Sequence, residues 1–275
     1  LKGYGDHRGL HLSLRRQRQV CIRDRVGDLH LMVDVFLLSY ASGLTPAILF
    51  LPGGSWFTAN RAGIKDRFGI SLAEEGYVCV VGEYRVASEA LWPAQIQDVK
   101  STIGGMRANS SKLGIDSSKL VVAGKSAGGH LALMAGLATD VAEFEDGVGG
   151  SDVSSGVSAA VGISPVLDMS WAVGRKDLAS FLGTAPSPEM IKSARPVEYV
   201  RGNNPPTLLI HGTSDSRVHH SMTVNMHQKL EQAGVPADLH LYAGQDHSFD
   251  ADLAFAQSIV REIDLFISRF VLIND

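Results

Sequence analysis

Two kinds of hydrophobic pattern alternate along most of the chain. Short, almost continuously apolar runs predict strands that are buried on both faces, and they lie at residues 47–51, 77–81, 120–123, 157–163, 207–211 and 238–242. Longer stretches between them predict helices, at residues 64–75, 93–113, 127–138, 219–233 and 253–270. Near the N-terminus, alternating apolar and polar residues at 20–26 and 29–37 predict two antiparallel strands joined near Gly27 and Asp28. We therefore expect an α/β fold with a mostly parallel central sheet, antiparallel N-terminal strands and helices on both faces.

Two segments interrupt this alternation. Residues 140–155 are rich in glycine, serine and acidic side chains, and residues 168–204 contain Trp171, Phe181 and several prolines. Because ligands bind at the carboxyl ends of strands in parallel sheets, insertions of this kind usually shape the mouth of the substrate site. We expect one domain over residues 1–275, with a small cap or loops near 140–155 and 168–204.

Composition narrows the class of protein. The chain has 275 residues, of which 45% are hydrophobic, and a formal net charge of -4. This charge gives no electrostatic signature of nucleic-acid binding, and we interpret the arginines at 15–25 as a solvated strand or hairpin. Two cysteines, Cys21 and Cys79, are too few for a disulfide framework. No apolar run is long enough to span a membrane and no signal-peptide pattern is present, so we expect a soluble, cytoplasmic protein.

The most informative motif is Gly124-Lys125-Ser126-Ala127-Gly128, which follows the apolar run at 120–123 and precedes an apolar helical stretch. A strand, sharp turn and helix is the context in which GxSxG forms a nucleophile elbow, with the serine hydroxyl raised above the sheet. Glycines are required on both sides of the serine because strand and helix approach closely there. Ser126 is therefore the candidate nucleophile.

The same residues have two other interpretations. A phosphate-binding GxxxxGK[ST] loop would need glycine at position 119, which is Lys119, and a glycine-rich segment where this chain has a strand. The alternative that Ser126 merely caps a helix stays open from the motif alone. The case for a nucleophile therefore depends on companion residues.

A serine nucleophile needs a histidine base, and the best candidate is His247. It lies in a glycine-bearing loop between the last strand and the last helix, as the order serine, acid, histidine requires. His130 is a rival because it lies one turn after Ser126, but we expect it to bond a neighbouring backbone or loop group. The histidines at 219, 220 and 227 lack metal-binding spacing, so we expect no metal site and no cofactor.

The orienting carboxylate is expected to be Asp215, in the loop that directly follows the strand at 207–211. Asp215 could also serve as a turn residue. Asp246, next to the base, and Asp168, after an earlier apolar segment, remain alternatives for the acid.

Backbone donors for the developing oxyanion are predicted at Gly53 and Gly54, which follow the strand at 47–51, together with the N–H of Ala127. Consecutive glycines also occur in ordinary turns. Their combination with Ser126 and His247 favours the catalytic interpretation.

Several motifs together resemble the α/β-hydrolases of the bacterial esterase type, close to the BD-FAE-like and hormone-sensitive-lipase-like carboxylesterases. The resemblance covers roughly residue 33 to the C-terminus, and the motifs are Pro52-Gly53-Gly54-Ser55-Trp56, Glu83-Tyr84-Arg85, Pro93 to Val99, Gly124 to His130, Pro205 to Asp215 and Gln245 to Phe249. It implies an α/β-hydrolase fold, a triad of Ser126, Asp215 and His247, and an oxyanion hole at Gly53, Gly54 and Ala127. Two positions depart from the family pattern, where Pro52 replaces histidine and Ser55 replaces the third glycine.

The resulting hypothesis is a serine hydrolase that cleaves small-molecule carboxylic esters through an acyl-enzyme. An amidase, exopeptidase or kynurenine-formamidase-like hydrolase is the alternative, and a non-catalytic ligand-binding fold is a further one. Pocket walls are expected from Trp56, Phe57, Trp171 and Phe181. Lys125 either binds an acidic substrate or extends a solvated amine, and self-association into a homo-oligomer is left open.

Overall fold

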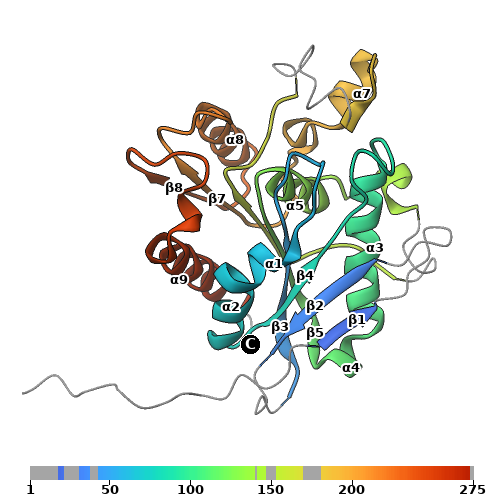
Figure 1. The fold of residues 1–275 in the computed structure, drawn as a ribbon, viewed down its shortest axis with the longest axis vertical. Helices are drawn as coiled ribbons and strands as arrows, with labels where there is room; N and C mark the ends of the chain where they lie inside the picture. The colour runs from blue at the N-terminus through green and yellow to red at the C-terminus, as the bar shows by residue number, and fades with distance from the viewer. Residues whose placement is uncertain are drawn as a thin grey trace, which may run out of the picture.

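The fold is an eight-stranded sheet with helices on both sides (Figure 1). A computed structural model describes residues 18–21, 31–37, 43–139, 141–146, 153–169 and 181–272. The strands run in the order β1-β2-β4-β3-β5-β6-β7-β8. The pairs from β4 to β8 are parallel, whereas β1 pairs with β2, and β2 with β4, in antiparallel fashion. The predicted fold class, a mostly parallel sheet with an antiparallel start, is confirmed.

The strands overlap the apolar runs and the alternating N-terminal segments of the sequence, but the strand at 115–125 begins five residues before its apolar run at 120–123. They are β1 Arg18–Cys21, β2 Met32–Phe36, β3 Thr45–Leu51, β4 Val78–Gly82, β5 Ile115–Lys125, β6 Ala159–Ile163, β7 Thr207–Gly212 and β8 Ala237–Tyr242. The α-helices are α1 Arg61–Ile64, α2 Ile70–Glu74, α3 Ala94–Ala108, α4 Ser110–Leu113, α5 Ala127–Leu137, α7 Pro188–Ser193, α8 Ser221–Gln232 and α9 Leu253–Phe270. A π-helical segment η1, Lys65–Gly69, joins α1 to α2, and short 3-10 turns include η2 Ala142–Glu145, η4 Pro196–Tyr199 and η5 Phe249–Ala251.

Alternate residues of the central strands pack against two separate helical layers. Leu49 and Leu51 of β3 belong to a core that includes side chains of α3, α5 and α8. Ile48 and Phe50 face the other side, where η1, α2 and α9 pack. This explains why the strands are apolar without alternation, since both faces of the sheet are buried.

Several predicted boundaries differ from the observed ones. The expected helix at 64–75 begins earlier, because the Asn60 side chain accepts a hydrogen bond from the N–H of Ala62 and caps α1. The expected helix at 93–113 is divided at Asn109 into α3 and α4. The N-terminal pair is antiparallel as predicted, but β1 ends at Cys21, and the predicted turn at Gly27 and Asp28 lies outside the described residues.

The described part of the first insertion packs against α3, and that of the second packs against α5. Phe144 of the first is buried against Trp92, with ring centroids 5.4 Å apart. The buried ammonium of Lys100 on α3 bonds Glu145 at 2.5 Å, and Ser155 shares that carboxylate. The division into one domain with two insertions remains our proposal. Within the described residues, no helix is long and apolar enough to cross a membrane.

Candidate active site

Ser126 occupies a strained turn between β5 and α5. Its backbone has φ 54° and ψ -119°, an unusual conformation for a side-chain-bearing residue. A methyl group on Gly124 would lie 2.3 Å from the carbonyl oxygen of Gly128, and one on Gly128 would lie 2.2 Å from that of Leu51. The two glycines therefore have the steric role expected of them, and the turn is a nucleophile elbow in its geometry.

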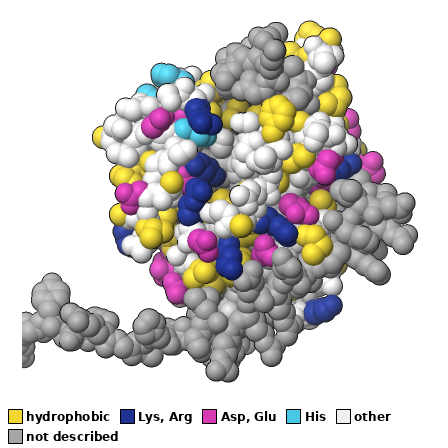
Figure 2. All heavy atoms as spheres, viewed as in Figure 1, with side chains coloured by type: hydrophobic (Ala, Val, Ile, Leu, Met, Phe, Trp, Pro, Cys, Tyr) yellow, Lys and Arg dark blue, Asp and Glu magenta, His cyan; other side chains and the backbone are white. Residues whose placement is uncertain are grey.

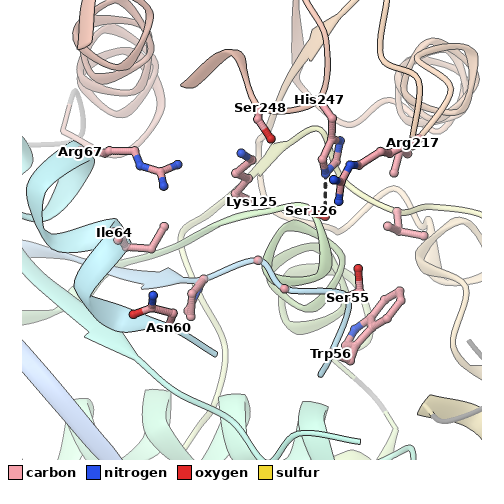
Figure 3. Close-up of a pocket in the computed structure, with 16 residues that line it drawn as sticks. Ser55, Trp56, Asn60, Ile64, Arg67, Lys125, Ser126, Arg217, His247 and Ser248 are labelled. Carbon is pink, nitrogen blue, oxygen red and sulfur yellow. Dashed lines mark hydrogen bonds between the residues drawn. The ribbon is translucent and has the colours of Figure 1, made fainter. Parts of the chain in front are cut away.

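A continuous hydrogen-bonded chain connects the serine to a histidine and a carboxylate (Figure 3). The Oγ of Ser126 lies 3.0 Å from Nε2 of His247, and Nδ1 of His247 lies 2.7 Å from Oδ2 of Asp215. The three residues come from the ends of β5, β7 and β8, which are parallel and so deliver their following loops to one edge of the sheet. The structure brings together the three side chains named as candidates from the sequence.

The carboxylate of Asp215 is fully occupied. Its Oδ1 accepts from the backbone N–H groups of Arg217 and Val218, at 2.9 and 2.8 Å, and its Oδ2 accepts from His247 and from Nε2 of His211. Burial acts to raise the pKa of Asp215, but the hydrogen bonds from His211, His247 and Val218 outweigh it and hold that pKa well below its usual range. Asp215 therefore stays ionised and can fix the orientation of His247. The sequence did not identify His211 as a partner of the acid.

His130 has the structural role expected of it. Its side chain is fully buried, and Nε2 donates to the carbonyl oxygen of Ala194, 2.8 Å away. Desolvation by burial lowers its pKa to about 4. The ring also makes edge contacts with Trp56 and Phe181. His130 thus ties α5 to the described part of the second insertion.

The alternative acids have other partners. Asp246 accepts hydrogen bonds from the backbone N–H of Ser216, from the Ser216 hydroxyl and from the N–H of His247, and so joins the acid loop to the base loop. Asp168 forms an ion pair with Arg195 at 3.2 Å. Within the described residues, no group of three or more His, Cys, Asp or Glu side chains could hold a metal ion.

Backbone donors lie next to Ser126 on its other side. A methyl group on Gly53 would lie 3.1 Å from Cβ of Ser126, so this glycine can approach the nucleophile only because it lacks a side chain. Ala127 is the first residue of α5 and the Ser126 side chain does not cap the helix, so the N–H of Ala127 is one that the helix itself leaves unpaired. Gly54 lines the pocket and has φ 141°. These are the three residues predicted to hold an oxyanion.

The two departures from the family pattern in this loop have structural consequences. Pro52 keeps its carbonyl oxygen in a hydrogen bond with the hydroxyl of Tyr84, at 2.9 Å, and Tyr84 is buried. Ser55 has φ 53°, a left-handed conformation that glycine adopts more readily. The loop is therefore held in place through Tyr84 although it lacks the family's histidine.

The triad opens into a pocket of about 420 Å³. Its walls are formed by the oxyanion loop, the start of the α1–η1 segment and the acid and base loops, and include Trp56, Asn60, Ile64, Arg67, Lys125, Val166, Arg217, Val218 and Ser248. A pocket of this size accommodates a small ester. Lys125 was predicted to line the site. Arg67, Arg217, Asn60, Ile64, Val218 and Ser248 were not, although Ser248 belongs to the motif at 245–249.

Of the expected aromatic walls that lie in the described residues, only Trp56 lines this pocket. It is buried and stacks on Phe181 with ring centroids 4.3 Å apart. Phe181 itself is fully buried behind Trp56 and does not line the pocket, so its role as a wall is corrected to support of Trp56. Phe57 is not among the lining residues and is 44% exposed. Trp171 lies outside the described residues.

Lys125 does not extend into solvent as a free amine. Its Nζ forms an ion pair with Asp250, whose other oxygen accepts from Arg67 at 2.7 Å. Asp250 is fully buried, three residues after His247. Asp250 thereby connects Lys125, which precedes the nucleophile, to Arg67 of η1 and to the loop that carries His247.

The architecture and the serine elbow together define an α/β-hydrolase fold. Residues 33–230 match the BD-FAE family model. The chain therefore belongs to the BD-FAE family.

Named relatives of the chain are esterases. Esterase LipC of Mycobacterium tuberculosis is 34% identical over 239 residues, which are 82% of this chain and 58% of LipC. The chain spans about half the length of the curated relatives it matches.

Solved structures of similar proteins superpose over nearly the whole chain. Esterase 2 of the planctomycete Thermogutta terrifontis with propionate bound has a TM-score of 0.80 and 26% identity, with 94% of this chain and 96% of that chain covered. A structure of the same esterase phosphonylated by cyclosarin has a TM-score of 0.81 and 26% identity, with coverages of 95% and 97%. A truncated carbohydrate esterase from gut microbiota has a TM-score of 0.80 and 26% identity, with coverages of 94% and 98%.

Proposed function

We propose that this protein hydrolyses carboxylic esters of small molecules through an acyl-enzyme formed on Ser126. The observation that carries the proposal is the hydrogen-bonded chain from Ser126 through His247 to Asp215 at the floor of an open pocket. The esterase names of the relatives support the same activity.

In the first half of the reaction, Nε2 of His247 accepts the proton of the Ser126 hydroxyl as Oγ attacks the ester carbonyl carbon. The carbonyl oxygen becomes an oxyanion, for which the N–H groups of Gly53, Gly54 and Ala127 are the proposed donors. The intermediate then collapses, the bond to the alcohol oxygen breaks, and His247 gives its proton to that oxygen. Ser126 now carries the acyl group.

In the second half, His247 accepts a proton from water, whose oxygen attacks the acyl carbon. The Ser126–acyl bond breaks, Oγ regains the proton from His247, and the carboxylic acid leaves. Throughout, Asp215 accepts the Nδ1–H of His247 and stabilises the imidazolium that forms twice in the cycle.

Hydrolysis of short-chain aryl esters by the wild type and by Ser126→Ala tests this function. We expect kcat/KM to fall at least about 10³-fold in the variant. A matched ester and amide with the same acyl group, assayed beside it, separates the esterase from the amidase alternative, because an esterase turns over the ester much faster. Equal ester turnover by the wild type and Ser126→Ala would contradict the proposal.

A cytoplasmic location and self-association stay predictions. Fractionation of producing cells tests the first, and sedimentation of the purified protein tests the second. Neither outcome alters the assignment of the triad.

A further inference from the structure

The pocket has an uneven distribution of charge. Apart from His247, the ionisable side chains that line it are Arg67, Lys125 and Arg217, and no Asp or Glu is among the lining residues. Figure 2 shows Lys and Arg side chains gathered beside a histidine near the middle of one face of the molecule. A neutral ester gives no reason for three cations around the nucleophile.

Two of these cations are already neutralised in part. Lys125 and Arg67 both bind the buried carboxylate of Asp250. Asp250 thus accounts for two of the three lining cations, and the third positive charge has no carboxylate partner among the described residues.

That charge is at Arg217. Its guanidinium is exposed and has no hydrogen-bond or ion-pair partner in the part of the chain that the structure describes. Asp215 cannot serve as its partner, because both oxygens of that carboxylate already accept two hydrogen bonds each. In Figure 3 the side chain of Arg217 projects toward the Ser126–His247 pair.

The backbone of Arg217 is fixed next to the catalytic acid. Its backbone N–H donates to Asp215 Oδ1 at 2.9 Å, in a turn that the catalytic carboxylate itself organises. A guanidinium is planar and presents two parallel N–H groups, a geometry that matches a carboxylate. Arg217 thus adds to the pocket lining a guanidinium whose N–H groups are available to an anion.

We propose that the pocket selects esters that bear a carboxylate in addition to the scissile bond, and that Arg217 binds this carboxylate. The proposal rests on the proposed esterase activity and names its substrate class. The carboxylate can belong to the acyl part, as in a monoester of a dicarboxylic acid, or to the alcohol part, as in an ester of a hydroxy acid.

Two pairs of substrates test this. Aryl butyrate and the aryl monoester of succinate differ by a carboxylate on the acyl side, and phenyl acetate and 4-carboxyphenyl acetate differ by one on the alcohol side. For each pair the ratio of kcat/KM for the charged ester to that for the neutral ester is measured in the wild type, R217Q, R217K and R261Q. Arg261 is an exposed arginine on α9 outside the pocket lining, and its variant changes the net charge equally.

In at least one pair we expect R217Q to lower the ratio about fivefold, the size of one charge-assisted contact near the surface. R217K keeps the positive charge but loses the two parallel N–H groups of the guanidinium, so it should lower the ratio less than R217Q does. R261Q should leave the ratio unchanged. Added salt should lower the ratio in the wild type.

An unchanged ratio in both pairs for R217Q overturns the proposal, as does an equal fall in R261Q. If R217Q does not fold, R217K tests the proposal instead, because loss of the planar guanidinium must still lower the ratio of kcat/KM for the charged ester to that for the neutral ester. These outcomes differ from failure of the proposed function, in which the wild type and Ser126→Ala would hydrolyse the neutral esters equally.

Discussion

We expect the His130→Gln variant to lose less stability in mild acid than the wild type does. In the folded state His130 is buried, Nε2 donates to Ala194, and Nδ1 has no hydrogen-bond partner within the described structure. A second proton would therefore have to be held on Nδ1 among Trp56, Trp92 and Phe181 without an acceptor. This explains why desolvation lowers the pKa from 6.5 to about 4.

The sign of the effect follows from the proton that each state binds. Between pH 6.5 and about 4, His130 is protonated in the unfolded chain but neutral in the folded one, so protons favour unfolding and the free energy of unfolding falls as the pH falls. The full difference between the two pKa values corresponds to about 3 kcal/mol, and to about 2 kcal/mol at about pH 5. Above pH 6.5 both states are neutral and the contribution vanishes.

Urea unfolding at about pH 7.5 and about pH 5 measures this contribution. We expect the wild type to lose about 2 kcal/mol more between the two pH values than H130Q, because glutamine can keep the bond to Ala194 but does not titrate. His219→Gln, which removes an exposed imidazole, is the matched control and should behave as the wild type. Equal pH dependence in the wild type and H130Q would refute the reasoning.

Three further substitutions test the surroundings of the triad. G128A places a methyl group 2.2 Å from the carbonyl oxygen of Leu51 and should lower the free energy of unfolding by about 2 kcal/mol or more; a loss under about 0.5 kcal/mol in urea unfolding would contradict the close approach. D250N removes the charge shared by two cations and should cost about 3 kcal/mol in the same assay, whereas wild-type stability would show that the ion pairs contribute little. Y84F leaves the carbonyl oxygen of Pro52 without its donor, so kcat for an aryl ester should fall about tenfold with little change in KM; unchanged kcat would mean that the hydroxyl does not position the oxyanion loop.

Much of the fold and the centre of the site could be predicted because they depend on local chemistry. The apolar runs fix the strands, and the steric demands of Gly124 and Gly128 follow from the elbow alone. Chain order then places His247 and Asp215 in loops at the same sheet edge as Ser126. The geometry of these three residues in the structure agrees with that expectation.

What could not be predicted depends on contacts between distant parts of the chain. Asp250 meets Lys125 and Arg67 across 125 and 183 positions, and no local pattern indicates that pairing. Phe181 was expected to line the pocket, but an aromatic residue in an insertion can either line a pocket or pack in the core. The sequence does not distinguish the two roles, and the packing of Phe181 against Trp56 does. The proposed role of Arg217 was not expected, because it depends on the absence of a partner within the described residues, which only the surrounding structure reveals.

The central claim is that Ser126 is the nucleophile of an esterase, and covalent labelling tests it most directly. The purified protein is treated with an aryl or alkyl fluorophosphonate, and the modified peptide is located by mass spectrometry. Our account predicts one adduct, on the peptide that contains Ser126, none on Ser126→Ala, and loss of ester hydrolysis in proportion to labelling. Equal labelling of the wild type and Ser126→Ala, or full ester hydrolysis by the labelled protein, would contradict it.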